Sequence, residues 1–224
     1  IQQKRNSPVA MKLEPALSPL GDLGHAGEIS RPSLIWRRIT LPSSSLVIMP
    51  KTMLALAEIA RKYGSGLVRF RMPVDLRRHQ PGSNAAGNLI GVMLLDVDEQ
   101  DSVRSLVKKL NRQLSERRDI PKVQPRWVRV LARWIPFFVL EVLAKYVTYQ
   151  YLRTQQYHYS ATLSSVAATS LADYSTEQFT AKSMFGVPIA PMTSAVFVAI
   201  CSNPQTTEIT IGANSQRVSQ ESLI

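Results

Sequence analysis

Three histidines are the side chains best suited to acid–base chemistry near neutral pH in this sequence. His25 lies in a segment rich in proline and glycine, His79 follows two arginines, and His158 stands between two tyrosines. None has another histidine, a cysteine or a carboxylate at metal-ligand spacing, so the sequence predicts no zinc site. We interpret His79 and His158 as ordinary surface and core residues.

Serine nucleophiles and phosphate-binding loops also need characteristic spacings. The nucleophile elbow is Gly-x-Ser-x-Gly, whereas the nearest string, Gly64-Ser65-Gly66, has the wrong spacing and follows a predicted helix. The glycines at positions 82, 87 and 91 match neither a phosphate loop nor a dinucleotide-binding motif. The sequence therefore argues against nucleotide hydrolysis.

The composition sets the broad class. The 224 residues are 45% hydrophobic and 19% charged, which suits one domain or one large lobe with a real core. The formal net charge of +11 favours an anionic partner without choosing one. The single cysteine, Cys201, cannot form an internal disulfide and fits a reducing, cytoplasmic compartment. No uncharged apolar run reaches the ~20 residues that span a bilayer, and the first residues, Ile-Gln-Gln-Lys-Arg, lack the apolar core of a signal peptide.

One local basic patch stands out between residues 104 and 133, where ten basic residues occur with two acidic ones. A solvated helix face that keeps the protein in solution is the plainer interpretation. The alternative is a surface for the phosphates of a ligand or for an acidic carrier. The candidate contacts are Lys108, Lys109, Arg112, Arg117 and Arg118.

The first half of the chain predicts helices and strands in alternation. Residues 36–41 alternate like a short strand. A helix begins near Pro50, and Gly64 stands where a left-handed C-terminal cap belongs. Residues 67–74 predict a strand with one polar face, in which Pro73 marks the strand's end or a sheet edge.

Further along, the apolar run 88–97 is typical of a strand buried on both faces. Asp98 is expected to cap a helix with an apolar stripe from Val103 to Leu114 and basic residues opposite. Residues 157–211 predict strands that end in a hairpin. Residues 1–35 read as a linker or lobe-connecting segment that builds no core, so residues 36–224 form the predicted lobe.

The stretch 126–152 combines tryptophan and phenylalanine with flanking arginines, and Pro136 is expected to break it into two helices. A helix pair buried in the core is the favoured interpretation. The alternative is a helix on a membrane surface, because aromatic residues on an apolar face with basic flanks are the interfacial pattern. The aromatic residues do not interleave as stacking platforms, which argues against nucleic acid.

A resemblance to a known superfamily emerges between Pro50 and Val97. The helix is followed by the string Met-Pro-Val-Asp-Leu-Arg-Arg over residues 72–78 and then by Gly87-Asn88. This order resembles the C-terminal lobe of the CoA- and carrier-dependent acyltransferases, which include condensation domains, wax ester synthases, alcohol acyltransferases and chloramphenicol acetyltransferase. Residues 163–167 resemble the Ser-Asn-x-Gly strand of that lobe, with Ser165 in place of the asparagine.

The resemblance implies a fold and an activity. The fold would be α/β of the α+β sandwich type, a chloramphenicol-acetyltransferase-like lobe with a mixed sheet flanked by helices. The activity would be acyl transfer from a CoA or phosphopantetheine thioester on a carrier protein to an alcohol or amine, without a tightly bound cofactor. The family's HHxxxD histidine belongs to an N-terminal lobe, and this sequence contains no HHxxxD. The chain alone should therefore be inactive.

The resemblance also implies roles for particular residues. Asp75 and Arg77 would stabilise the end of their strand, and Asn88 would hold a loop near the substrate tunnel. Ser164 and Ser165 would lie near the reacting centre, where a hydroxyl can stabilise an oxyanion. Ordinary strand hydroxyls are the alternative for both serines.

Three functions stay open on the sequence. The first is the C-terminal lobe of an acyltransferase or condensation-like enzyme, and a chain that begins without methionine fits a piece of something longer. The second is a non-catalytic binding module of the same fold. The third is a peripheral-membrane or anionic-surface binder that uses the same positive charge.

Overall fold

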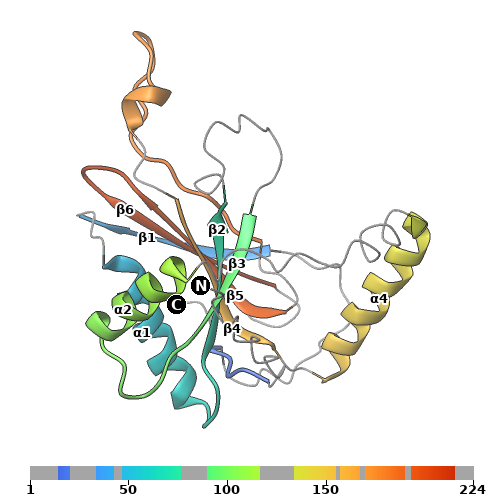
Figure 1. Ribbon diagram of the computed structural model, residues 1–224. Helices are drawn as coiled ribbons and strands as arrows, with labels where there is room; N and C mark the ends of the chain where they lie inside the picture. The colour runs from blue at the N-terminus through green and yellow to red at the C-terminus, as the bar shows by residue number, and fades with distance from the viewer. Residues whose placement is uncertain are drawn as a thin grey trace, which may run out of the picture.

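The computed structural model describes the following stretches of the chain: residues 15–20, 34–42, 47–76, 90–116, 134–154, 157–166, 170–189 and 193–214. In these stretches six strands form one mixed sheet in the order β1-β6-β5-β4-β2-β3 (Figure 1). Helices flank this sheet, and the α+β class predicted from the sequence is confirmed.

The strands are β1 (Leu34–Leu41), β2 (Arg69–Asp75), β3 (Ile90–Asp96), β4 (Tyr159–Val166), β5 (Ser194–Ser202) and β6 (Thr207–Asn214). The helices are α1 (Ile48–Lys62), α2 (Val103–Ser115), α4 (Phe137–Thr154) and a 3-10 helix at Leu171–Tyr174. β4 runs parallel to both of its neighbours, β5 and β2, and the other pairs are antiparallel. The predicted terminal hairpin is the pair β5–β6.

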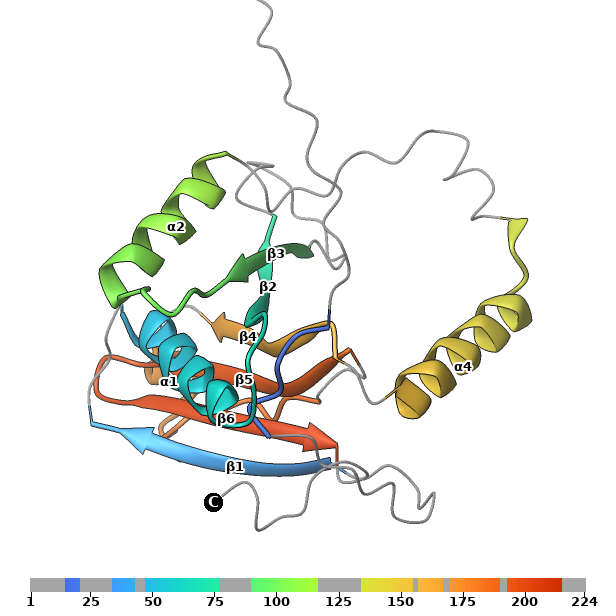
Figure 2. The same cartoon turned by 90° about the horizontal axis from the view of Figure 1, so that it is seen from below.

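The hydrophobic core lies between one face of the sheet and α1. This helix buries a stripe at helical spacing, with Met53, Ala57 and Ala60 fully covered. The stripe packs with Phe70 of β2 and Leu163 of β4, which are also fully buried. α2 contacts α1 and β3, so both helices lie on the same face of the sheet (Figure 2).

The two predicted helix ends differ from the observed ones. Gly64 is not left-handed; among the described glycines only Gly66 has a positive φ, at 156°. The N-cap of α2 is Ser102 and not Asp98, because the side chains of Ser102 and Ser105 each accept a hydrogen bond from the other residue's backbone N–H. Asp98 instead opens the turn that precedes this cap.

The run 88–97 is not a strand buried on both faces. β3 is an edge strand in which Met93 and Leu95 are buried while Ile90 and Val92 are 51% and 39% exposed. The length of the apolar run suggested burial on both faces, but only one face of β3 is covered by a helix in the described part of the chain. β2 is internal, and Pro73 lies beyond its pairing with β4, close to the strand's end.

The expectation that no core forms before residue 36 is wrong for residues 15–20. Ala16 is buried, and its backbone N–H donates to the carbonyl of Tyr157 at 2.8 Å. Leu17 and Leu20 pack against the hydrophobic core, and the N–H of Leu17 donates to Leu67 at 2.8 Å. Residues 15–20 therefore cover the end of the core at which β2 and β4 begin.

Candidate functional site

The sheet face opposite α1 and α2, called the open face from here on, carries a polar pattern. Pairing registers align one row of side chains across four strands: Arg38, Thr210, Ala199 and Ser164. A neighbouring row on the same face consists of Thr40, Glu208, Cys201 and Val166. Because side chains alternate along a strand, the residues between these rows belong to the apolar core face.

Glu208 is the electrostatic centre of the open face. Its side chain is 1% exposed, and its Oε2 accepts hydrogen bonds from Arg38 Nε at 2.8 Å and Thr40 Oγ1 at 2.7 Å. Burial alone would raise the pKa of Glu208, but the hydrogen bonds from Arg38 and Thr40 outweigh burial and lower this pKa. The carboxylate is therefore charged, and through two donors on β1 it ties β6 to β1.

A long connection between β4 and β5, residues 170–189, is called the arm. Its base lies on β1, where Phe185 stacks beside Trp36 with ring centroids 6.0 Å apart. The Arg38 guanidinium lies 4.2 Å from the centroid of the Phe185 ring and also donates to Ser183 Oγ at 3.2 Å. Arg38 thus joins the buried carboxylate to the arm.

The backbone of the arm also crosses β6 directly. A Cβ atom placed on Gly212 would overlap the carbonyl oxygen of Pro188, and Pro188 itself is buried. Only glycine allows this close approach of two backbones. Residues 183–188 of the arm therefore have a defined position on the open face: Arg38 contacts Ser183 and Phe185, and Gly212 leaves room for the carbonyl of Pro188.

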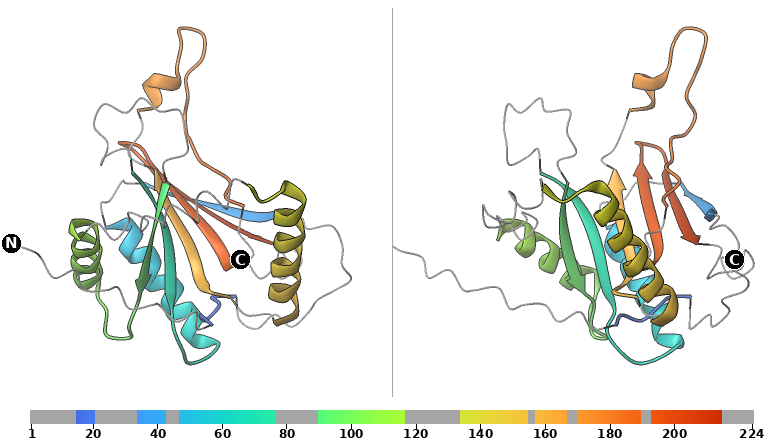
Figure 3. Two further views of the ribbon diagram at one scale, coloured as in Figure 1. Left: turned by 45° about the vertical axis from the view of Figure 1, so that its right-hand side comes forward. Right: turned by 90° about the vertical axis from the view of Figure 1, so that its right-hand side faces the viewer.

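The outer part of the arm projects beyond the sheet (Figure 3). Ser170 caps its 3-10 helix, and Thr176 and Phe179 close a tight turn with reciprocal backbone hydrogen bonds of 2.7 and 3.3 Å. Tyr174 and Phe179 are 54% and 62% exposed. The arm therefore has an ordered turn in its outer part, with exposed aromatic side chains at residues 174 and 179.

The two predicted tunnel serines do not share a face. Ser164 pairs with Ala199 and belongs to the open face, where it is half-buried. Ser165 pairs with Ile200 and points to the core side of the sheet, exposed at the end of β4. Only Ser164 is in register with the row that contains Arg38.

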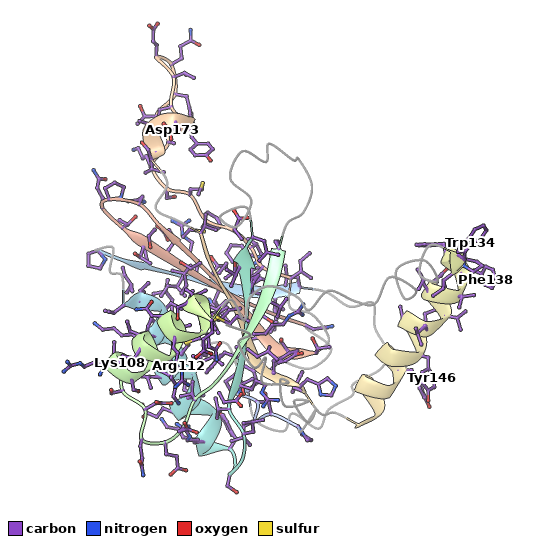
Figure 4. The ribbon with its side chains drawn as sticks, in the orientation of Figure 1. Lys108, Arg112, Trp134, Phe138, Tyr146 and Asp173 are labelled. Atoms are coloured by element: carbon purple, nitrogen blue, oxygen red, sulfur yellow. The ribbon has the colours of Figure 1, made fainter. Side chains whose placement is uncertain are left out.

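The predicted phosphate contacts on α2 have different environments. Lys108 and Arg112 are exposed on its outer side (Figure 4). Lys109 Nζ instead lies 2.7 Å from Asp98 Oδ2 and 2.6 Å from Asp101 Oδ2. Burial would lower the pKa of Lys109, but the two carboxylates outweigh burial and raise it. The ammonium group of Lys109 is therefore already paired with two carboxylates of the turn that precedes α2. Arg117 and Arg118 lie outside the described residues.

The motif residues of the first half of the lobe are only partly described. Asp75 ends β2, opposite Ile90, and is exposed. Arg77 and Asn88 lie outside the described residues. The acid–base pair that does stabilise β2 was not predicted: Arg69, 6% exposed, binds both carboxylate oxygens of Asp96 on β3, at 2.6 and 2.9 Å.

Sequence reasoning also missed Glu208 and Arg38. The signal was present, because Glu208 interrupts a run of threonine and isoleucine residues over 206–211, and a buried carboxylate requires a paired cation. What the sequence does not specify is which arginine pairs with it. That choice depends on the β1–β6 register, which places Thr40 opposite Glu208 and Arg38 one row away.

Solved structures show what this arrangement resembles. The starter condensation domain of rhizomide synthetase RzmA superposes with a TM-score of 0.51 at 13% identity, over 94% of this chain and 44% of that chain. The EpoB cyclization-docking bidomain from Sorangium cellulosum matches with a TM-score of 0.48 at 14% identity, over 93% of this chain and 42% of that chain. No family model and no curated protein matches the sequence.

The chain therefore has the fold of a condensation-domain lobe, and the resemblance seen in the sequence is confirmed at the level of the fold. It spans less than half the length of the structures that it matches.

Proposed function

We propose that this chain is the C-terminal lobe of a two-lobed acyl-transferring enzyme, in which an N-terminal lobe supplies the catalytic histidine. The observation that carries the proposal is the match of nearly the whole chain to 44% of a condensation domain. An acyl-CoA or an acyl carrier protein would be the donor, and an alcohol or amine would be the acceptor. The transfer exchanges a thioester for an ester or an amide.

The chemistry of the proposed reaction assigns a role to the open face. A histidine of the N-terminal lobe would take the proton of the acceptor as it attacks the thioester carbonyl. The resulting oxyanion needs hydrogen-bond donors, and Ser164 is the hydroxyl that the open face offers at the end of β4. Collapse of this intermediate releases the thiol of CoA or of the phosphopantetheine group.

The arm gives the proposed N-terminal lobe a place to dock. Tyr174 and Phe179 are exposed at its tip, and the base is fixed to the sheet through Arg38 and Gly212. An exposed aromatic pair on an anchored projection suits contact with a second folded body. Lys108 and Arg112 remain the candidates for the phosphates of CoA or for an acidic carrier.

The test uses the product of the complete coding sequence. Purified protein is mixed with an acyl-CoA and an alcohol or amine, and release of free thiol is followed together with the mass of the acylated acceptor. Transfer that disappears when a histidine of an HHxxxD motif is replaced by alanine supports the proposal. A complete gene product without that motif, and without transfer, leaves a binding module of this fold.

A second pair of variants tests the position of the site. Ser164→Ala is expected to lower kcat about a hundredfold, because an oxyanion loses a donor. Ser165→Ala changes a hydroxyl on the other face of the same strand and is expected to have a smaller effect. Equal effects of the two substitutions would remove Ser164 from the site.

A further inference from the structure

Two features of the described chain take no part in the proposed transfer: helix α4 and the side chain of Arg71. α4 lies apart from the sheet and from α1 and α2 (Figures 1 and 2). The prediction that residues 126–152 form a buried helix pair is wrong for this part, because Trp134 and Phe137 are each 80% exposed. The break at Pro136 is confirmed, since α4 begins at the next residue. None of the described helices is long and apolar enough to cross a membrane, and α4 by itself does not specify what covers it.

Arg71 lies on the open face, in the internal strand β2. Phe70, which precedes it, is fully buried in the hydrophobic core, so the alternation of side chains along a strand places Arg71 on the opposite face. On the neighbouring strand β4, Thr162 is in register with Arg71, and Ser164 lies two residues further along on the same face. Arg71 is therefore one row away from the hydroxyl that the proposed reaction uses.

The charge of Arg71 has no anionic partner within the described residues. Other basic side chains that are at least partly buried there donate to an oxygen atom: Arg38 to Glu208, Arg61 to the carbonyl of Val97, Arg69 to Asp96, and Lys109 to Asp98 and Asp101. Arg71 is half-buried, and its guanidinium instead lies over the ring of Tyr159, with Cζ 5.8 Å from the ring centroid. The closest carboxylate along the β2–β3 ladder, that of Asp96, is bound at both oxygens by Arg69.

The guanidinium of Arg71 has the chemistry of an anion site. Arginine is always protonated and presents five N–H donors in a planar fork. The contact with Tyr159 attracts the positive charge to the face of the ring, but it gives the donors no oxygen acceptor. Partial burial removes some of the water that would otherwise satisfy these donors. A carboxylate is the group that matches the fork, because it accepts two parallel hydrogen bonds from one guanidinium.

We propose that Arg71 binds a carboxylate of the substrate that is several carbon atoms away from the reacting group. This inference rests on the proposed acyl transfer and adds a substrate class to it. The separation follows from the strands: the two residues from Thr162 to Ser164 span about 7 Å, and Tyr159 holds the guanidinium near the start of β4 while Ser164 lies toward its end. The phosphates of CoA lie at the far end of the pantetheine chain and are too far from the thioester to occupy this place.

The carboxylate can belong to the acyl group or to the acceptor, and two substrate pairs separate these sources. Adipoyl-CoA and hexanoyl-CoA differ only in a terminal carboxylate on chains of equal length, and 6-aminohexanoate and hexylamine differ in the same way as acceptors. The product of the complete coding sequence is assayed by thiol release with each donor and with each acceptor. We expect kcat/KM for the carboxylate member to be about ten- to a hundredfold higher in one of the pairs, which is the effect of a hydrogen bond between charged groups.

Substitutions of Arg71 test whether its side chain makes this contact. Arg71→Gln should abolish the preference for the carboxylate and leave kcat/KM for the uncharged member within about twofold of the wild type. Arg71→Lys keeps the charge without the planar fork and should retain part of the preference. Arg37→Gln, which removes an exposed arginine from edge strand β1, changes the net charge equally and should leave the preference unchanged. Circular dichroism checks that each variant is folded.

Binding of the carboxylate is also measured without turnover. In NMR spectra of the same protein, the Nε–H signal of Arg71 is identified by its disappearance in Arg71→Lys. Hexanoate should shift this signal in a saturable manner, because its carboxylate accepts hydrogen bonds from the guanidinium. Hexanamide has the same chain without the charge and should leave the signal in place.

Three results would overturn the inference. They are equal kcat/KM within both substrate pairs, an Arg71 signal that hexanoate does not shift, and an equal loss of kcat/KM for all four substrates in Arg71→Gln. The first two leave the proposed acyl transfer unaffected, and the third would assign the guanidinium to a contact inside the protein. If the wild type transfers no acyl group at all, the proposed function fails, and the NMR titration alone decides whether Arg71 binds a carboxylate.

Discussion

The face of the sheet that carries α1 and α2 is packed with apolar side chains, whereas the open face is organised by a charge. On the first face Met53, Phe70 and Leu163 are fully buried against one another. On the second, Glu208 is equally buried but is bound by Arg38 and Thr40, and the arm passes over it. The same sheet is therefore held by apolar packing on one face and by hydrogen bonds to a buried carboxylate on the other.

The difference lies in what each face can tolerate. Apolar packing is non-directional, so the helix-covered face gains stability from area and loses it when a cavity opens. Hydrogen bonds to a buried carboxylate are directional, and they fix the arm in one position at a modest net gain. We expect substitutions on the helix-covered face to change stability and substitutions on the open face to change the position of the arm.

The largest effect is expected on the helix-covered face. Phe70→Ala removes a fully buried ring from between the sheet and α1 and should lower the free energy of unfolding by about 3–5 kcal/mol. Urea denaturation followed by circular dichroism measures the change. Val92→Ala, on the open face of edge strand β3, is the control and should cost less than about 1 kcal/mol. Similar costs for both would remove the contrast between the faces.

The next effect tests the path of the arm. Gly212→Ala places a methyl group where the carbonyl of Pro188 lies, so the arm must move, at a cost of about 1–3 kcal/mol. Limited proteolysis should then cut the arm faster than in the wild type. Gly186→Ala, whose added Cβ has no neighbour within 4 Å, is the matched control and should leave the cleavage rate unchanged.

The charge of the open face is tested by Glu208→Gln. The substitution keeps the shape and weakens the hydrogen bonds from Arg38 and Thr40, and we expect a loss of about 1–2 kcal/mol near pH 7. The arm should also be cut faster, because Arg38 loses the carboxylate that orients it toward Phe185. Glu177→Gln on the exposed arm changes the same charge and should alter neither property.

The same carboxylate predicts a pH dependence. The pKa of Glu208 is lower in the folded protein than its ordinary value of 4.5. The contribution of the charged Glu208 to the free energy of unfolding is therefore fully present above pH 4.5. It is lost as the pH falls through the lowered pKa. Between pH 5 and pH 3 the stability of the wild type should therefore fall more steeply than that of Glu208→Gln. Parallel slopes would show that Glu208 is not stabilised in its charged form.

Local patterns in the sequence predicted most elements of this fold. Helix spacing and the break at Pro136 placed α1, α2 and the start of α4, and the alternation of residues 67–74 placed β2. The apolar run of β3 failed because run length does not reveal whether a second layer covers a strand. The core interpretation of α4 failed for the same reason, since hydrophobicity specifies burial without naming the partner.

The site was less predictable than the elements. The resemblance led to Ser164, but strand alternation separates it from Ser165, and this follows only when the face of β4 is known. Arg38, Glu208 and Gly212 are brought together by pairing between segments about 170 residues apart in the chain. The acidic residue inside an apolar run indicates that Glu208 needs a cation, but the pairing register that selects Arg38 leaves no local signal in the sequence.

The smallest effect separates two neighbouring lysines that the sequence treats alike. Lys109→Gln removes the cation between Asp98 and Asp101 and should cost about 0.5–1 kcal/mol at low salt, whereas Lys108→Gln, on the exposed side of α2, should cost less. If α2 contacts the phosphates of the donor, the roles reverse in the thiol-release assay, where Lys108→Gln should raise KM for acyl-CoA and Lys109→Gln should not. An equal rise in KM for both would show that the assay reports the net charge of α2 and not a contact made by Lys108.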